Sequence, residues 1–89
     1  MKWGYKLDPA ATRELRDLGP SVAREIRVFL DKRILGASDP RLFGKPLRGS
    51  KHGLWRYRIR DYRIVCRIED ALITVVVVAV GHRSTVYDE

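Results

Sequence analysis

The sequence contains few of the residues from which disulfides, zinc sites or membrane anchors are built. One cysteine and two histidines in 89 residues exclude an internal disulfide and a zinc site with four cysteine or histidine ligands. The longest apolar run, residues 71–81, is too short to span a bilayer, and Lys2 and Lys6 interrupt any apolar start that a signal peptide would need. We therefore expect a cytoplasmic protein that does not enter a membrane. No cofactor is expected either.

Acidic residues are nearly missing from one stretch of the chain. Between Arg41 and Arg67 there are nine lysines and arginines but a single acid, Asp61, so this stretch has a net charge of +8. The other nine bases and ten acids leave the rest of the chain at −1. Because the excess positive charge is confined to one stretch, the sequence indicates a surface that binds a polyanion such as a nucleic acid.

The hydrophobic residues, 45% of the chain, are enough for one folded core but not for two. No repeat, low-complexity tract or linker interrupts them, so residues 1–89 are predicted to form a single domain. Residues 1–7 alternate between apolar and polar and predict a strand. Asp8 followed by a proline is a typical helix start, and the apolar spacing then predicts two helices, Pro9–Leu18 and Pro20–Leu35, that form an antiparallel hairpin.

The stretch Gly53–Ile68 alternates between apolar and basic residues and predicts a β-hairpin. A two-residue loop at Arg60 and Asp61 would place these residues opposite one another: Trp55 and Cys66, Tyr57 and Ile64, Arg58 and Arg63, Ile59 and Tyr62. Arg-Asp is a poor dipeptide for such a tight turn, which leaves a longer loop open as an alternative. The aromatic residues then share one face of the hairpin, and the arginines share the other.

The valine-rich run that follows, Leu72–Val80, is typical of a strand buried on both faces and is predicted to be the central strand. The expected fold is therefore α+β, in the order β-α-α-β-β-β, with the N-terminal strand and the helical hairpin packed on an antiparallel sheet. Residues 37–53 are predicted to be mainly loop. The helices should cover the aromatic face, which places these residues in the core: Trp3, Trp55, Tyr57, Tyr62 and Cys66.

The uncovered face of this sheet would carry Arg56, Arg58 and Arg63 without a neighbouring carboxylate. Like charges directly opposite each other destabilise a sheet, whereas guanidinium groups bind phosphates bidentately. We therefore interpret the row as an anion-binding surface rather than an ordinary solvated face. On this interpretation the three arginines carry no core packing, and truncating any of them should leave stability almost unchanged. Further RNA contacts are expected from four other bases: Lys45, Arg48, Lys51 and Arg60.

Several motifs together resemble a known family. They are LxxLG at the bend of the helical hairpin, KPLRG at Lys45–Gly49, YRIVCRI at Tyr62–Ile68 and VGHRSTVY at Val80–Tyr87. In this combination the chain is similar to RelE-type toxins of bacterial toxin–antitoxin pairs, within the RelE/ParE superfamily. The resemblance implies an endoribonuclease that cuts mRNA in the ribosomal A site without a metal, in contact with rRNA and mRNA. It also implies a cognate RelB-like antitoxin that wraps the toxin and blocks it.

By position, the resemblance assigns catalysis to five residues: Arg56, Arg58, Arg63, Arg83 and Tyr87. The first two are lysines in the best-known member of the family. Since arginine effectively keeps its proton, these two positions would stabilise charge on the phosphate rather than act as a general base. Tyr87 would then be the candidate for proton transfer, with His52 and His82 as alternatives.

Two other functions remain open. A ParE-like toxin, which inhibits gyrase by binding a protein, shares the scaffold, although it would not need the arginine strand together with Arg83 and Tyr87. A non-catalytic RNA-binding module would also account for the basic stripe.

Overall fold

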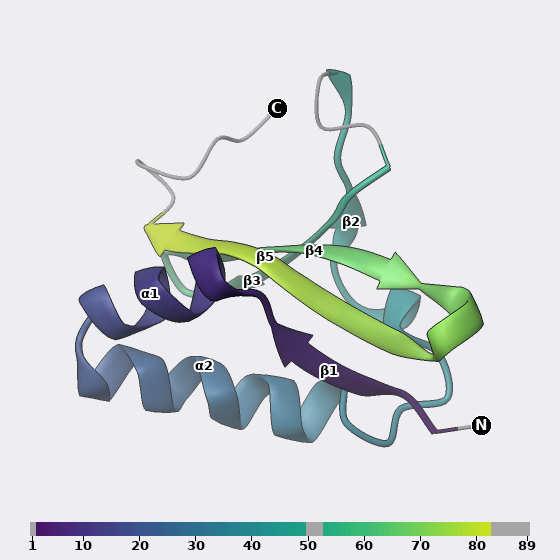
Figure 1. The fold of residues 1–89 in the computed structure, drawn as a ribbon, viewed down its shortest axis with the longest axis horizontal. Coiled ribbons are helices and arrows are strands. Elements are labelled where there is room, and N and C mark those ends of the chain that lie inside the picture. The colour runs from purple at the N-terminus through teal and green to yellow at the C-terminus, as the bar shows by residue number, and fades with distance from the viewer. Residues whose placement is uncertain (1, 50–52, 83–89) are drawn as a thin grey trace.

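The computed structural model describes residues 2–49 and 53–82. In it, two helices pack on one side of a five-stranded sheet (Figure 1). The helices are α1 (Pro9–Asp17) and α2 (Pro20–Arg33). The strands are β1 (Gly4–Leu7), β2 (Lys45–Pro46), β3 (Trp55–Ile59), β4 (Tyr62–Glu69) and β5 (Thr74–His82). Single 3₁₀ turns precede β2, at η1 (Pro40–Leu42), and β5, at η3 (Asp70–Leu72). Within the described ranges, no helix has the length and apolar character needed to cross a membrane.

The strands lie in the order β1-β5-β4-β3-β2. The α+β fold is confirmed, and the sheet is antiparallel except for one pair of strands. β1 pairs with β5 in parallel, with Leu7 beside Val77, whereas the other neighbours are antiparallel. Parallel strands need a long connection, and here the two helices and three strands between β1 and β5 supply it. The valine-rich β5 lies next to the edge strand, so the middle strand is β4 rather than β5.

The predicted element boundaries differ by a few residues from those observed. β1 begins at Gly4, and the helices end at Asp17 and Arg33, one and two residues earlier than predicted. After α2 the chain turns back onto the start of β1, where the Gly36 N–H donates to the Trp3 carbonyl at 2.7 Å. The predicted loop at residues 37–53 contains β2, a two-residue strand with a proline, which is too short to show any periodicity.

The β3–β4 hairpin has the predicted register in every pair, from Trp55 opposite Cys66 to Ile59 opposite Tyr62. Its loop consists of Arg60 and Asp61 alone, so the longer loop does not occur. Arg60 has a φ of 52°, in the left-handed region that is uncommon for residues other than glycine.

The core lies between the helices and the sheet. Leu15 of α1 and Ile26, Leu30 and Ile34 of the α2 segment pack against residues that β3, β4 and β5 present to this side. The sheet residues of this cluster are Tyr57, Ile64, Cys66, Val75, Val77 and Val80. The predicted core positions are confirmed: Trp3, Tyr57 and Cys66 are buried, and Trp55 and Tyr62 pack against the cluster while partly buried. α1 begins as predicted, because the Asp8 carboxylate accepts the Ala11 N–H at 2.8 Å.

Candidate functional site

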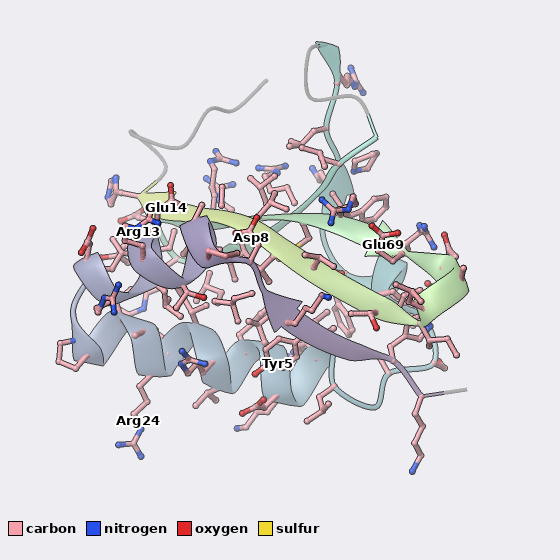
Figure 2. All side chains as sticks on the ribbon, viewed as in Figure 1. Tyr5, Asp8, Arg13, Glu14, Arg24 and Glu69 are labelled. Carbon is pink, nitrogen blue, oxygen red and sulfur yellow. The ribbon has the colours of Figure 1, made fainter. Side chains whose placement is uncertain are left out.

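The face of the sheet that the helices leave uncovered carries the predicted arginines. Arg56 and Arg58 lie on β3 and Arg63 on β4, with Arg58 directly opposite Arg63. Lys45 of β2 lies opposite Arg56 and extends the row to the edge of the sheet. We call these four residues the arginine face. In Figure 2 several side chains that end in nitrogen project from this side of the sheet, away from α2.

The three arginines are exposed to very different degrees. Arg58 is exposed and Arg56 is half-buried, but Arg63 is only 4% exposed. Arg63 lies on β4, the middle strand, which is flanked by β3 on one side and β5 on the other. Arg56 and Arg58 lie on β3, whose outer side is covered only by the two residues of β2. The expectation that none of the three arginines contributes to packing is therefore wrong for Arg63. A charge in such a setting has a fixed position and is less screened by water and salt than the charge of Arg58.

Small side chains lie beside the arginines on the same face. Arg56 is opposite Val65, which in turn pairs with Ala79, and Arg63 is opposite Gly81. The neighbours that β5 contributes are thus short, and the long basic side chains are the main feature of this face. Sequence reasoning missed these neighbours, because they depend on the pairing between β4 and β5.

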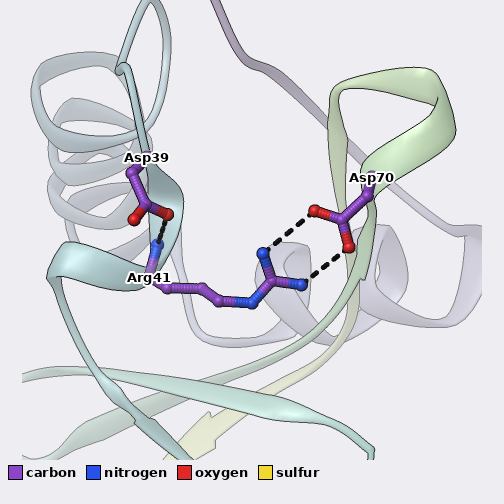
Figure 3. Close-up of polar contacts among 3 residues, drawn as sticks. All are labelled: Asp39, Arg41 and Asp70. Atoms are coloured by element: carbon purple, nitrogen blue, oxygen red, sulfur yellow. Dashed lines mark hydrogen bonds and ion pairs between the residues drawn. The ribbon is translucent and has the colours of Figure 1, made fainter.

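Within the described part of the chain, three bases of the basic stretch pair with carboxylates outside it. The guanidinium of Arg41 donates to both carboxylate oxygens of Asp70 at 3.0 and 2.9 Å, which joins η1 to η3 (Figure 3). The hydrogen bond lowers the pKa of Asp70. Arg60 is bound to Glu25 of α2 at 2.8 Å, and Arg67 to Glu69. The charge of these three bases is therefore partly compensated, and the net charge of +8 counted from the sequence overstates the positive charge of this surface.

Hydrogen bonds from two aromatic residues of β3, the partly buried Trp55 and the buried Tyr57, place β2 beside β3. The Trp55 indole donates to the Phe43 carbonyl and the Tyr57 hydroxyl to the Pro40 carbonyl, both at 2.7 Å. Gly44, which follows Phe43, packs against the backbone of β3 and has a φ of 78°. A Cβ at this position would lie 2.1 Å from the carbonyl oxygen of Arg56. Only glycine permits so close an approach. These contacts, which the sequence analysis did not identify, bring Lys45 next to Arg56.

The remaining predicted site residues are distributed as follows. Arg48 is exposed just after β2. Arg60, predicted to contact RNA, lies at the hairpin tip, and its guanidinium is turned to α2. His82 pairs with Tyr62, and their rings meet edge to face with centroids 5.6 Å apart, so this alternative proton-transfer residue lies on the helix side of the sheet. The other predicted residues lie outside the described part of the chain: Lys51, His52, Arg83 and Tyr87. Among the described residues, no three His, Cys, Asp or Glu side chains are grouped as a metal ion would require.

Comparisons of the sequence and of the fold both find toxins of bacterial toxin–antitoxin pairs. Residues 5–87 match the family described as "ParE toxin of type II toxin-antitoxin system, parDE". Toxin RelG of Mycobacterium tuberculosis is 31% identical over 87 residues, which cover 98% of each chain. Toxin RelE of the same organism is 34% identical over 77 residues, 86% of this chain and 77% of the relative. A chain in the solved toxin–antitoxin complex RelBE2 of M. tuberculosis is 29% identical, with a TM-score of 0.82 over 94% of both chains.

Proposed function

Because the chain belongs to the RelE/ParE superfamily of toxins from type II toxin–antitoxin pairs, we propose that it cleaves mRNA in the ribosomal A site and so inhibits translation. The observation that supports this most is the arginine face, on which four basic side chains occupy neighbouring positions on three strands. Guanidinium groups bind phosphate oxygens bidentately, so this face is suited to an RNA backbone.

Metal-free cleavage of RNA has three requirements at one phosphate. The 2′-OH must lose a proton, the pentacoordinate phosphate must be stabilised, and the 5′-oxygen must gain a proton. Arg56, Arg58 and Arg63 would meet the second requirement, because donors that are already in place stabilise charge as it develops. Arg58 is the most accessible of the three to a phosphate, whereas Arg63, buried on β4, would act mainly through its weakly screened charge.

The proton transfers would fall to Tyr87, assisted by the charge of Arg83. Both roles rest on the family resemblance, and Arg83 directly follows His82, the last residue of β5. Tyr87→Phe removes only the hydroxyl and should reduce single-turnover cleavage about 10²–10⁴-fold, the usual range for general acid–base catalysis, while ribosome binding persists. Wild-type cleavage by this variant would exclude a role in proton transfer.

The partner that would restrain this activity is a RelB-like antitoxin. The similar M. tuberculosis chain was solved in the RelBE2 toxin–antitoxin complex, and Escherichia coli RelE in the intact RelBE complex. For a toxin with a net charge of +7, we propose an acidic antitoxin segment that covers the arginine face. Its association rate should then fall steeply as salt is added, because long-range attraction is screened.

A ParE-like gyrase inhibitor is the second candidate, because the matching family carries the ParE name. A gyrase inhibitor acts by binding a protein and does not need a row of arginines that can hold a phosphate. The arginine face is thus the feature that favours RNA cleavage over gyrase binding.

Mapping mRNA 5′ ends in a translating extract would distinguish the two. New ends at A-site codons with the wild-type protein, and none with Arg58→Ala, would support RNA cleavage. Intact mRNA together with inhibited supercoiling by purified gyrase would support the ParE-like activity instead. RNA that is bound but neither cut nor accompanied by gyrase inhibition would leave only an RNA-binding module.

A further inference from the structure

The last part of β5 extends beyond its neighbour β1. β1 accompanies β5 only from Thr74 to Val77, and the chain then leaves the sheet at Asp8, whose N–H donates to the Val77 carbonyl at 2.9 Å. The N–H of Val80 points to this open side, although Val80 itself is only 2% exposed. A buried N–H needs an acceptor, because an unsatisfied one destabilises the strand that carries it.

The acceptor comes from α1. Glu14 Oε1 accepts the Val80 N–H at 2.8 Å, across 66 residues of sequence. Figure 2 shows Glu14 beside the end of β5. α1 does not need this bond to pack on the sheet, because its Ala11 and Leu15 side chains are fully buried in the core. The main effect of the Glu14 carboxylate is therefore on the strand rather than on the helix.

The bond follows an irregularity in β5. Val65 of β4 pairs with Ala79, but the next residue of β4 pairs with Val77, so Val78 is an extra residue in β5. A β-bulge of this kind bends the strand and changes the direction of the side chains beyond it.

Beyond the bulge, β5 runs beside the part of β4 that carries Arg63. Gly81 is the direct partner of Arg63, and Val80 immediately precedes it. The hydrogen bond from Val80 to Glu14 thus lies between the bulge and the residue that faces Arg63. This hydrogen bond holds Val80 in place. A small shift of the strand at Val80 would move Gly81 relative to the buried guanidinium of Arg63.

We infer that Glu14 is a positioning residue, whose carboxylate holds the end of β5 in place against Arg63. For its effect on cleavage this inference rests on the proposed function; its effect on the strand does not. The role requires an acceptor oxygen rather than a charge. Glu14→Gln should therefore preserve it, and Glu14→Ala should abolish it.

Amide exchange measured by NMR tests the effect on the strand without any assay of activity. In Glu14→Ala the Val80 amide should exchange at least about tenfold faster, as expected for local opening of a strand end, and the Gly81 and His82 amide signals should shift. In Glu14→Gln exchange should stay within about threefold of wild type, since the acceptor is kept. Asp17→Ala, which removes another carboxylate of α1, is the matched control and should change none of these signals. Unchanged Val80 exchange in Glu14→Ala would overturn the inference.

Single-turnover cleavage on programmed ribosomes tests the consequence for the site. With rates normalised to the folded fraction, Glu14→Ala should lower the cleavage rate at saturating ribosome by about 10²-fold, the scale expected for a misplaced group. The ribosome concentration for half-maximal rate should hardly change, and Glu14→Gln should restore the rate. If Glu14→Gln is as slow as Glu14→Ala, the side chain acts through its charge and the positioning role is wrong. If wild-type protein leaves mRNA intact, the proposed function fails, and the exchange data alone decide the role of Glu14.

Discussion

The two faces of the β3–β4 hairpin share one backbone but have contrasting surroundings. On the helix side, Tyr57, Ile64 and Cys66 are fully buried against the helices. On the other side, the alternate positions include Arg58 and Arg63, two like charges directly opposite each other. One pair of strands thus combines a packed apolar surface with an arrangement of charge that would be unfavourable by itself.

The free energies of charge repulsion and apolar burial explain how a packed face and a like-charged face can exist in one hairpin. A like-charged pair directly opposite in a sheet destabilises it by up to about 1 kcal/mol. Burying one large apolar side chain contributes about 1.5–3 kcal/mol, and the helix side of the hairpin buries several. The helix side therefore sets the register, and the other face can carry arginines that bind an anion. Substitutions on the two faces should separate stability from function, and their expected effects on stability range from several kcal/mol to almost none.

Leu30→Ala should give the largest loss of stability. Leu30 of α2 is fully buried in the core between the helices and the sheet, and a Leu-to-Ala truncation at such a site costs about 2–5 kcal/mol. The free energy of unfolding from urea titration measures it. Val28→Ala, on the same helix but 40% exposed, is the control and should lose much less. Equal losses at both positions would show that the helix layer does not protect the apolar face as described.

Substitutions of Arg63 test whether a residue of the arginine face also contributes to stability. Because Arg63 is buried on the arginine face, Arg63→Ala should lower the free energy of unfolding by about 1–3 kcal/mol through lost packing. Arg63→Met keeps a long apolar side chain without the charge and should retain most of the stability. Both variants should lose cleavage, measured by single-turnover assays on ribosomes. Full stability of Arg63→Ala in urea titrations would show that its stem does not contribute to packing.

Much of the fold can be predicted from local sequence patterns. The degree to which each side chain is buried and the pairing of distant segments cannot. The alternation of residues 53–68 identified the hairpin, its register and its two faces, because one slip would move every apolar residue to the wrong side. The same alternation assigns a residue to a face but gives no measure of its burial, so the burial of Arg63 was missed. The parallel β1–β5 pair, the bulge at Val78 and the bond from Glu14 to Val80 depend on residues far apart in sequence. The roles of Arg83 and Tyr87 stay predictions.

Cys66 provides a pH test of the packed face. The thiol is fully buried, and burial raises its pKa above the ordinary value. The folded state therefore holds the proton more tightly, so the contribution to stability is fully present below the unfolded pKa of about 8.5 and is lost as pH rises above it. Between about pH 9 and pH 10, the free energy of unfolding should fall by about 1.4 kcal/mol per pH unit more in wild type than in Cys66→Ala. Parallel curves for the two proteins would mean that the thiol ionises in the folded state.

Arg58 should show the smallest effect on stability and a large effect on activity. Its side chain is exposed opposite Arg63, so Arg58→Ala should change the free energy of unfolding by less than about 0.5 kcal/mol. Relief of the repulsion could even stabilise the hairpin. Cleavage should nevertheless fall about 10²–10³-fold, the scale for removing one charge-stabilising donor, and Arg58→Lys should be partly active because it keeps the charge but loses the planar fork.

The control for Arg58 is Arg24→Ala, which changes the net charge equally. Arg24 projects from α2 on the opposite side of the molecule (Figure 2), so its loss should leave cleavage unchanged. If both variants weaken cleavage to the same degree, the protein uses its overall positive charge to approach the ribosome, and no particular face holds the phosphate. If Arg58→Ala alone is inactive yet as stable as wild type, the charge is used for function at a position where the fold does not need it.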